Sequence, residues 1–184
     1  MTTKPFLTDV KTLRKRARQH IEEGAVTSSY GGDTKAAIKV LNDALATEIV
    51  CVLRYKRHYF MAKGIHAAPV AAEFLEHAND EQAHADRIAE RIVQLGGAPN
   101  LSPDGLLTRS HTEYLEANDD LVEMIKENLV AERIAVDSYR EIATYFAAFD
   151  STTRKMIEEI QAEEEEHADD LADLLQGMAK DIKR

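Results

Sequence analysis

Apolar side chains recur at intervals of three and four residues along most of the chain, which is the spacing of one buried helix face. Short stretches rich in Gly, Pro and Asp interrupt this repeat. The pattern predicts four long helices, at about 34–63, 67–95, 118–148 and 151–178. Gly64 and the Gly96–Gly97 pair mark the ends of the first two helices, and Asp150 or Ser151 caps the fourth.

A shorter helix is expected before these four, from near Leu7 to Gly24. A loop at 27–34 follows and ends in Asp33 or Thr34 as a helix cap. We therefore divide the chain into a basic N-terminal extension at 1–31 and a bundle domain at 32–184.

The lengths of the connections predict the topology. Short turns make the first two long helices antiparallel, and likewise the last two. The connection at 98–117 is long enough to travel the length of a helix of ~45 Å, so the second and third helices run parallel. The expected fold is all-α: a four-helix bundle with one long crossover and an extra short N-terminal helix.

Composition supports this fold and narrows the class of protein. The 184 residues include 8 Gly, 4 Pro, no Trp and 6% aromatic residues, which favours helices over sheets. One cysteine, Cys51, excludes an internal disulfide framework and a multi-cysteine zinc site, and we expect it to be a small buried apolar residue. No stretch has the roughly 20 apolar residues that span a bilayer. We expect a cytoplasmic protein with no membrane partner.

Charge divides the chain unevenly. The net charge is -10, yet the first twenty residues carry six basic residues against Asp9. These basic residues suggest DNA contact through phosphates, with five candidates: Lys11, Arg14, Lys15, Arg16 and Arg18. The alternative is that the apolar residues at 10, 13, 17 and 21, which have helical spacing, pack on a neighbouring subunit while the charges stay solvated.

Each long helix carries one glutamate inside its apolar stripe, where leucine would stabilise a bundle. The four are Glu48, Glu81, Glu132 and Glu164. A single such glutamate usually reaches solvent or forms an ion pair. Four near the midpoints of packed helices reach the same height, and no Lys or Arg shares their stripes nearby. Multivalent cations are the simplest compensation for their charge.

Two histidines sharpen this interpretation. His84 lies three residues after Glu81 and His167 three after Glu164, so each pair projects from one helix face. Two lone glutamates and two Glu-x-x-His pairs form the ligand set of a carboxylate-bridged dinuclear site, which suits iron or manganese.

Three further residues belong to this pattern. Tyr55 and Tyr139 each follow a stripe glutamate by seven residues, and we expect them either to support the ligands or to be ordinary core residues. His77 precedes His84 by one heptad, and is either an accessory ligand or a surface or hydrogen-bonded histidine.

Two segments resemble a known family. Residues 77–101 (HANDEQAHADRIAERIVQLGGAPNL) resemble the second helix of bacterioferritins, and 163–175 (EEEEHADDLADLL) resemble their last ligand motif. From about Lys35 to Leu175 the chain resembles the bacterioferritin and Dps-like branch of the ferritin-like superfamily. The resemblance implies two iron ions per subunit, with manganese or zinc as substitutes, and six ferroxidase ligands: Glu48, Glu81, His84, Glu132, Glu164 and His167. Glu81 and Glu164 occupy the bridging positions.

The function implied by this resemblance is iron storage and detoxification. The family oxidises Fe(II) with O2 or H2O2 and stores the ferric mineral in a homo-oligomeric cage, which protects against oxidative stress. Gln82 stands where bacterioferritins place a haem-binding Met, so no haem is expected. Only 17 residues follow His167, too few for the fifth helix of 24-subunit cages, so a 12-mer is favoured. The alternatives are Dps-type DNA protection and manganese-dependent peroxide disproportionation, as in manganese catalases.

Overall fold

The computed structural model describes residues 8–117 and 120–181, apart from the side chains of 179–181. Within these ranges the chain is helical and contains no strand. The elements are α1 (Val10–Arg16), a 3-10 helix (Ile21–Glu23), α2 (Thr34–Met61), α3 (Ala67–Gln94), α4 (Leu106–Arg109), α5 (Leu121–Phe146) and α6 (Ser151–Asp181). The prediction of an all-α fold is confirmed. None of the described helices combines the length and the apolar character that crossing a membrane requires.

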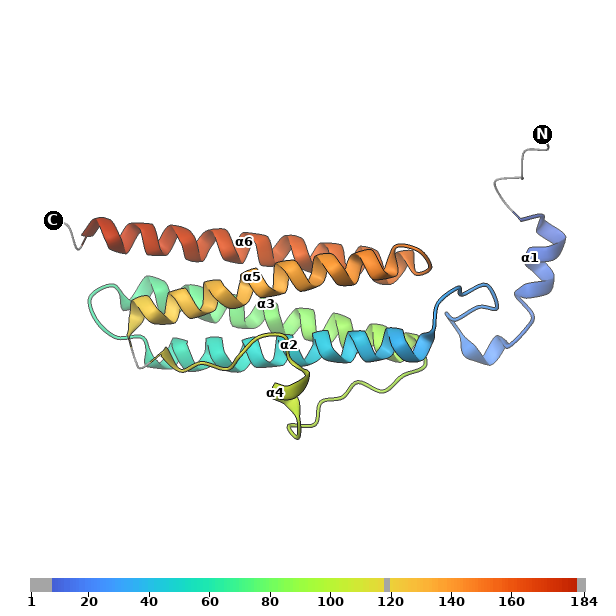
Figure 1. Ribbon diagram of the computed structural model, residues 1–184, viewed down its shortest axis with the longest axis horizontal. Coiled ribbons are helices and arrows are strands. Elements are labelled where there is room, and N and C mark those ends of the chain that lie inside the picture. Colours follow the sequence, from blue (N-terminus) through green and yellow to red (C-terminus); the bar gives the residue numbers. More distant parts are fainter. Residues whose placement is uncertain (1–7, 118–119, 182–184) are drawn as a thin grey trace.

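The four long helices form two hairpins, α2 with α3 and α5 with α6, which lie against each other as a bundle (Figure 1). Each hairpin is antiparallel because a short turn joins its helices. The crossover between the hairpins returns along the bundle and contains the single turn α4, so α3 and α5 run in the same direction (Figure 1). The predicted topology is therefore confirmed.

Local sequence explains where the long helices begin and end. The Asp33 carboxylate accepts hydrogen bonds from the backbone N–H groups of Lys35 and Ala36 at the start of α2. Asp120 caps α5 by accepting from Glu123 N, which places the start of α5 after the predicted residue 118. Residue 118 itself lies outside the described ranges.

The N-terminal helix differs from the prediction. It was expected from near Leu7, which is outside the described residues, to Gly24, but α1 ends at Arg16. The backbone then passes through His20 in a left-handed conformation before the short 3-10 helix. Since α1 buries none of its residues and stands apart from the bundle, no tertiary packing supports a longer helix (Figure 1).

The bundle interior contains two apolar clusters, one toward each end. One includes Leu41, Ile88 and Phe146, and the other includes Phe74 and Met124. Along each long helix the stripe glutamate falls between members of the two clusters. The apolar clusters therefore enclose a polar layer at mid-bundle.

A buried arginine fastens the crossover beside this layer. Arg54 Nε donates to Asn128 Oδ1 at 2.8 Å, and its Nη1 donates to the backbone carbonyl of Glu113 at 3.0 Å. His58 Nε2 lies 3.1 Å from the backbone carbonyl of Leu115. These bonds hold the end of the crossover against α2, because they satisfy its carbonyl groups at a buried surface.

Candidate metal centre

The six residues predicted as ligands meet in the middle of the bundle. Each is at most 6% exposed: Glu48 on α2, Glu81 and His84 on α3, Glu132 on α5, Glu164 and His167 on α6. The sequence predicted that the four glutamates lie at the same height along the bundle, and in the structure they do.

The ligand-type atoms fall into two overlapping groups. Glu48, Glu81, His84 and Glu164 form one group, and Glu81, Glu132, Glu164 and His167 form the other. Within each group the atoms lie within 4.8 Å of one another. Glu81 and Glu164 belong to both groups, which is the arrangement that two bridging carboxylates require. The two groups fit a di-iron site.

Both histidines direct Nδ1 toward the shared carboxylates. His84 Nδ1 lies 3.2 Å from Glu164 Oε1 and 3.3 Å from Glu48 Oε2. His167 Nδ1 lies 3.4 Å from Glu164 Oε2. Yet neither Nδ1 atom, nor either oxygen of Glu81 and Glu164, has a hydrogen-bond partner among the described residues. Buried polar atoms nearly always have a hydrogen-bond partner. The arrangement of these atoms therefore favours the binding of an external group over hydrogen bonds to one another.

The opposite side of each imidazole faces an acidic residue from the other hairpin. His84 Nε2 lies 2.7 Å from Glu163 Oε2, and Arg87 donates to the other oxygen of Glu163 at 3.0 Å. His167 Nε2 lies 3.5 Å from Asp80 Oδ2. Such contacts orient a metal-binding histidine and fix which ring nitrogen faces the site.

Sequence reasoning missed Glu163 and Asp80, although a signal was present. Each directly precedes the glutamate of a Glu-x-x-His pair, so both helices carry an acidic residue followed by Glu-x-x-His. In the structure, the extra acidic residue on each of these helices lies beside Nε2 of the histidine on the other helix.

The two tyrosines differ in their contacts. Tyr55 donates a hydrogen bond to Glu132 Oε1, and His77 Nδ1 lies 3.2 Å from the Tyr55 hydroxyl. The hydroxyl of Tyr139 is buried and has no partner among the described residues. Only Tyr55 is therefore seen to contact a ligand-type residue, and the supporting role of Tyr139 stays a prediction.

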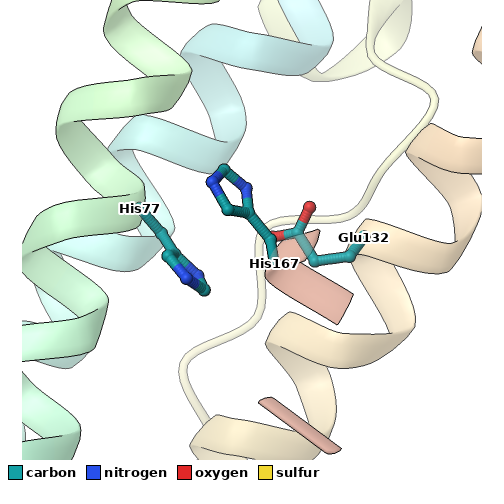
Figure 2. Close-up of side chains that lie close together, drawn as sticks. All are labelled: His77, Glu132 and His167. Carbon is teal, nitrogen blue, oxygen red and sulfur yellow. The ribbon is translucent and has the colours of Figure 1, made fainter. Parts of the chain in front are cut away.

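His77 lies beside the second histidine of the centre. Figure 2 shows the rings of His77 on α3 and His167 on α6 close together, with Glu132 reaching toward them from α5. The two rings stack with centroids 4.0 Å apart. Burial, followed by the nearby His167, lowers the pKa of His77 to about 3, so this ring is neutral near pH 7.

The pKa shifts reflect the number of acidic groups buried together at the centre. Burial, and then the charges of Glu81 and Glu164, raise the pKa of Glu48 and of Glu132 well above the usual range. Burial alone would lower the pKa of His84, but the carboxyl groups around it raise the pKa instead. The site therefore attracts positive charge strongly, and protons occupy it when no other cation does.

Cys51 is buried on α2, as predicted, but it is not surrounded only by apolar groups. Its sulfur lies 3.6 Å from the Thr112 hydroxyl and accepts a hydrogen bond from Arg54 at 3.5 Å. Burial raises the pKa of the Cys51 thiol well above its usual value, so the thiol stays protonated.

Comparison with known proteins agrees with this architecture. The model of the ferritin-like domain matches residues 38–180. The chain belongs to the ferritin-like family. The resemblance seen in the sequence is thus confirmed, and this ferritin-like protein has bacterioferritins among its relatives. Bacterioferritin from Rhodobacter capsulatus is 30% identical over 139 residues, covering 75% of this chain and 81% of that protein. Bacterioferritin BfrA from Mycobacterium tuberculosis is 30% identical over 149 residues, covering 78% and 86% of the two chains.

Solved structures give the same result. A dodecameric thioferritin, the bacterioferritin-related protein from Bacteroides fragilis, aligns with a TM-score of 0.79 and 36% identity, covering 82% of this chain and 90% of that one. Dps from Thermosynechococcus elongatus aligns with a TM-score of 0.74 at 20% identity, covering 77% and 90%, and supports the shared fold alone. The family and its bacterioferritin relatives support a role in iron storage.

Proposed function

We propose that this ferritin-like protein is a ferroxidase that oxidises Fe(II) with O2 or H2O2 and stores the ferric product. The supporting observation is the set of buried carboxylate and Nδ1 atoms that face one another and have no hydrogen-bond partner in the part of the chain that the structure describes. Uncompensated buried charges are costly, and two bound cations would satisfy all of these atoms together. Carboxylate oxygens and imidazole nitrogens are suitable donors for ferrous iron.

The residues have distinct roles in this proposal. Glu81 and Glu164 would contact both substrate ferrous ions, Glu48 and His84 would hold one of them, and Glu132 and His167 would hold the other. Glu163 and Asp80 orient the two imidazoles from outside, and Tyr55 orients Glu132.

Pairing two ferrous ions suits the chemistry of the oxidant. Two Fe(II) together supply two electrons, which with two protons reduce one H2O2 to two molecules of water. A paired transfer releases no one-electron oxygen radical, so the reaction would protect against oxidative stress.

Fe(II) oxidation in variants tests the proposal. Glu81→Ala and His84→Ala should each lower the rate of Fe(III) formation by at least about tenfold, because each removes a ligand. Glu166→Ala is the control, since Glu166 is an exposed acid inside the corresponding Glu-x-x-His motif on α6 and is not one of the ligand-type residues. Rates equal to wild type in both ligand variants would refute the assignment.

A homo-oligomeric cage is part of the proposal, with 12 subunits favoured over 24. The support is the similarity to the bacterioferritin-related protein from Bacteroides fragilis, whose structure is described as dodecameric. The native mass of the assembly, measured together with its metal content, tests both the size and the stoichiometry of two irons per subunit.

Haem binding, domain boundaries and location stay as the sequence predicts them. Gln82 is exposed on α3 and bonds to Asp86 at 3.0 Å, and no haem is expected at this position. An absorbance spectrum of the protein reconstituted with haem tests this. The division at 31 and the cytoplasmic location stay predictions.

Two alternatives concern other chemistry. Manganese-dependent peroxide disproportionation would use the same ligands, and gas evolution from H2O2 without added Fe(II) would favour it.

DNA binding would use the N-terminal extension, where the five candidate basic residues are all exposed. A gel shift that weakens with salt and vanishes on deletion of residues 1–20 would support DNA binding, whereas no shift at low salt would dismiss it.

A further inference from the structure

A further group of ligand-type atoms, apart from the two at the centre, lies on the outer side of His77. Glu73, His77 and Asp170 bring such atoms within 4.8 Å of one another. His77 Nε2 lies 3.3 Å from Glu73 Oε1 and 3.9 Å from Asp170 Oδ2. The side chain of His77 is only 2% exposed, whereas Glu73 is partly exposed and Asp170 is exposed. The group therefore connects the bundle interior to the surface.

The hydrogen bonds around His77 leave its outer nitrogen as an acceptor. Tyr55 gives its hydroxyl proton to Glu132, so the Tyr55 oxygen can only accept from His77 Nδ1–H. A neutral imidazole that carries its proton on Nδ1 has a lone pair on Nε2. Accordingly, Nε2 is buried and has no hydrogen-bond partner among the described residues, although Glu73 is close to it.

A lone pair and two carboxylates that converge without a proton between them repel one another. A cation placed among them turns all three into ligands and removes the repulsion. One imidazole nitrogen with carboxylate oxygens is a donor set suited to divalent iron, manganese or zinc.

The group is accessible from solvent. A surface pocket of about 420 Å³ between α3 and α6 is lined by Glu73, Asp170, Asp173 and His66 among others. Three of these four residues are acidic and can bind a cation through their carboxylate oxygens. The charge of Glu76 adds to the negative field at Glu73. A hydrated cation can therefore reach the carboxylates of Glu73 and Asp170 from the surface side, and His77 Nε2 lies buried within 4 Å of both.

We propose that Glu73, His77 and Asp170 form a third divalent-cation site, separate from the six ligands of the dinuclear centre. This proposal rests on the proposed function in one respect, the identity of the cation. In the cell the cation would be ferrous iron, which the site would hold beside the centre before oxidation. A cation on Nε2 also makes His77 Nδ1–H a stronger donor to Tyr55, which in turn bonds to Glu132. The outer ion is thus linked to a ligand of the inner pair.

Cobalt(II) binding to the full-length, metal-free protein tests this site without any oxidation. The test variant is Glu73→Gln with Asp170→Asn, which keeps the side-chain shapes. The control is Glu90→Gln with Asp169→Asn, which removes the same charge from exposed positions on α3 and α6. Bound cobalt per chain is measured after equilibrium dialysis, and anomalous diffraction locates each ion.

We expect the test variant to bind about one cobalt ion fewer per chain than wild type, and the control to match wild type. Equal binding by wild type and the test variant, or no cobalt density beside His77 Nε2, would overturn the third site and show a simple ion pair there. Glu81→Ala separates the two proposals. It should lose the inner ions and keep the outer ion, whereas full binding by Glu81→Ala would count against the dinuclear centre alone.

Discussion

Two buried polar clusters lie in the same bundle and differ in how their atoms are satisfied. Near the α5–α6 turn, Asp150 accepts two hydrogen bonds from Arg91 at 3.0 Å and one from Thr153 N at 2.9 Å. Arg91 Nε donates to the Thr153 hydroxyl at 2.7 Å, and Tyr30 also donates to Asp150. At mid-bundle, by contrast, the carboxylate oxygens of Glu81 and Glu164 have no such partners among the described residues.

The difference distinguishes a structural cluster from a binding site. The Arg91–Asp150 cluster balances one cation with one anion and caps α6, so it is complete as the chain folds. The central layer has four glutamates and two histidines, with no Lys or Arg among them, so under the proposed function it would be completed by cations from outside. The predictions below test this contrast, from the largest expected change to the smallest.

Breaking the complete cluster should cost the most stability. Asp150→Ala removes the cap of α6 and leaves the buried Arg91 without its anion, which should lower the free energy of unfolding by about 3 kcal/mol. Denaturant unfolding of the metal-free protein measures this. A loss below about 1 kcal/mol would mean that the cluster does not act as a structural unit.

Removing a glutamate from the central layer should have the opposite sign. Glu81→Leu eliminates two buried oxygens for which the described residues provide no partner, so we expect it to stabilise the metal-free protein by about 1–3 kcal/mol. We also expect added metal to raise the melting temperature of wild type, and Glu81→Leu should abolish that rise. Destabilisation of the metal-free protein by Glu81→Leu would show that these oxygens are satisfied after all.

The two tyrosines provide a matched pair. Tyr55→Phe removes a hydrogen bond to Glu132, and cobalt affinity at the centre should fall about 10-fold or more. Tyr139→Phe removes a hydroxyl that has no partner among the described residues, so it should leave the affinity close to wild type. Equal losses in both variants would mean that ring packing, not the hydrogen bond, matters.

A surface ion pair should matter least. Asp137 accepts from Arg140 at 2.6 Å, but both side chains are mostly exposed to solvent. Asp137→Ala should therefore change the free energy of unfolding by no more than about 0.5 kcal/mol, measured as for Asp150→Ala. A larger loss would weaken the argument that burial and completeness make the Arg91–Asp150 cluster important.

Much of the fold could be predicted because its signals are local or follow from chain length. Apolar spacing indicates helices, Asp33 and Asp150 have capping side chains, and the long connection at 98–117 allows α3 and α5 to run parallel. The N-terminal helix was predicted too long, because apolar spacing alone does not show whether a partner surface exists for it to pack on.

The candidate centre was predictable in part for a similar reason. Glutamates in apolar stripes and the Glu-x-x-His spacing are visible in one dimension, and they pointed to six residues that the structure brings together. The contacts of Glu163, Asp80 and Tyr55 were not predictable as specific pairs. Each joins different helices, and their partners depend on the rotation of one helix against another.

The sequence by itself determined the four long helices, their direction in the bundle, and the level at which the acidic residues lie, because helical periodicity and loop length decide these. Only the tertiary structure decided which carboxylates belong to both metal-sized groups and which face of each imidazole points inward. It also decided that His77 Nε2 lies beside Glu73 and Asp170 with no hydrogen-bond partner among the described residues. These are relations between side chains on different helices, and packing of the helices fixes them.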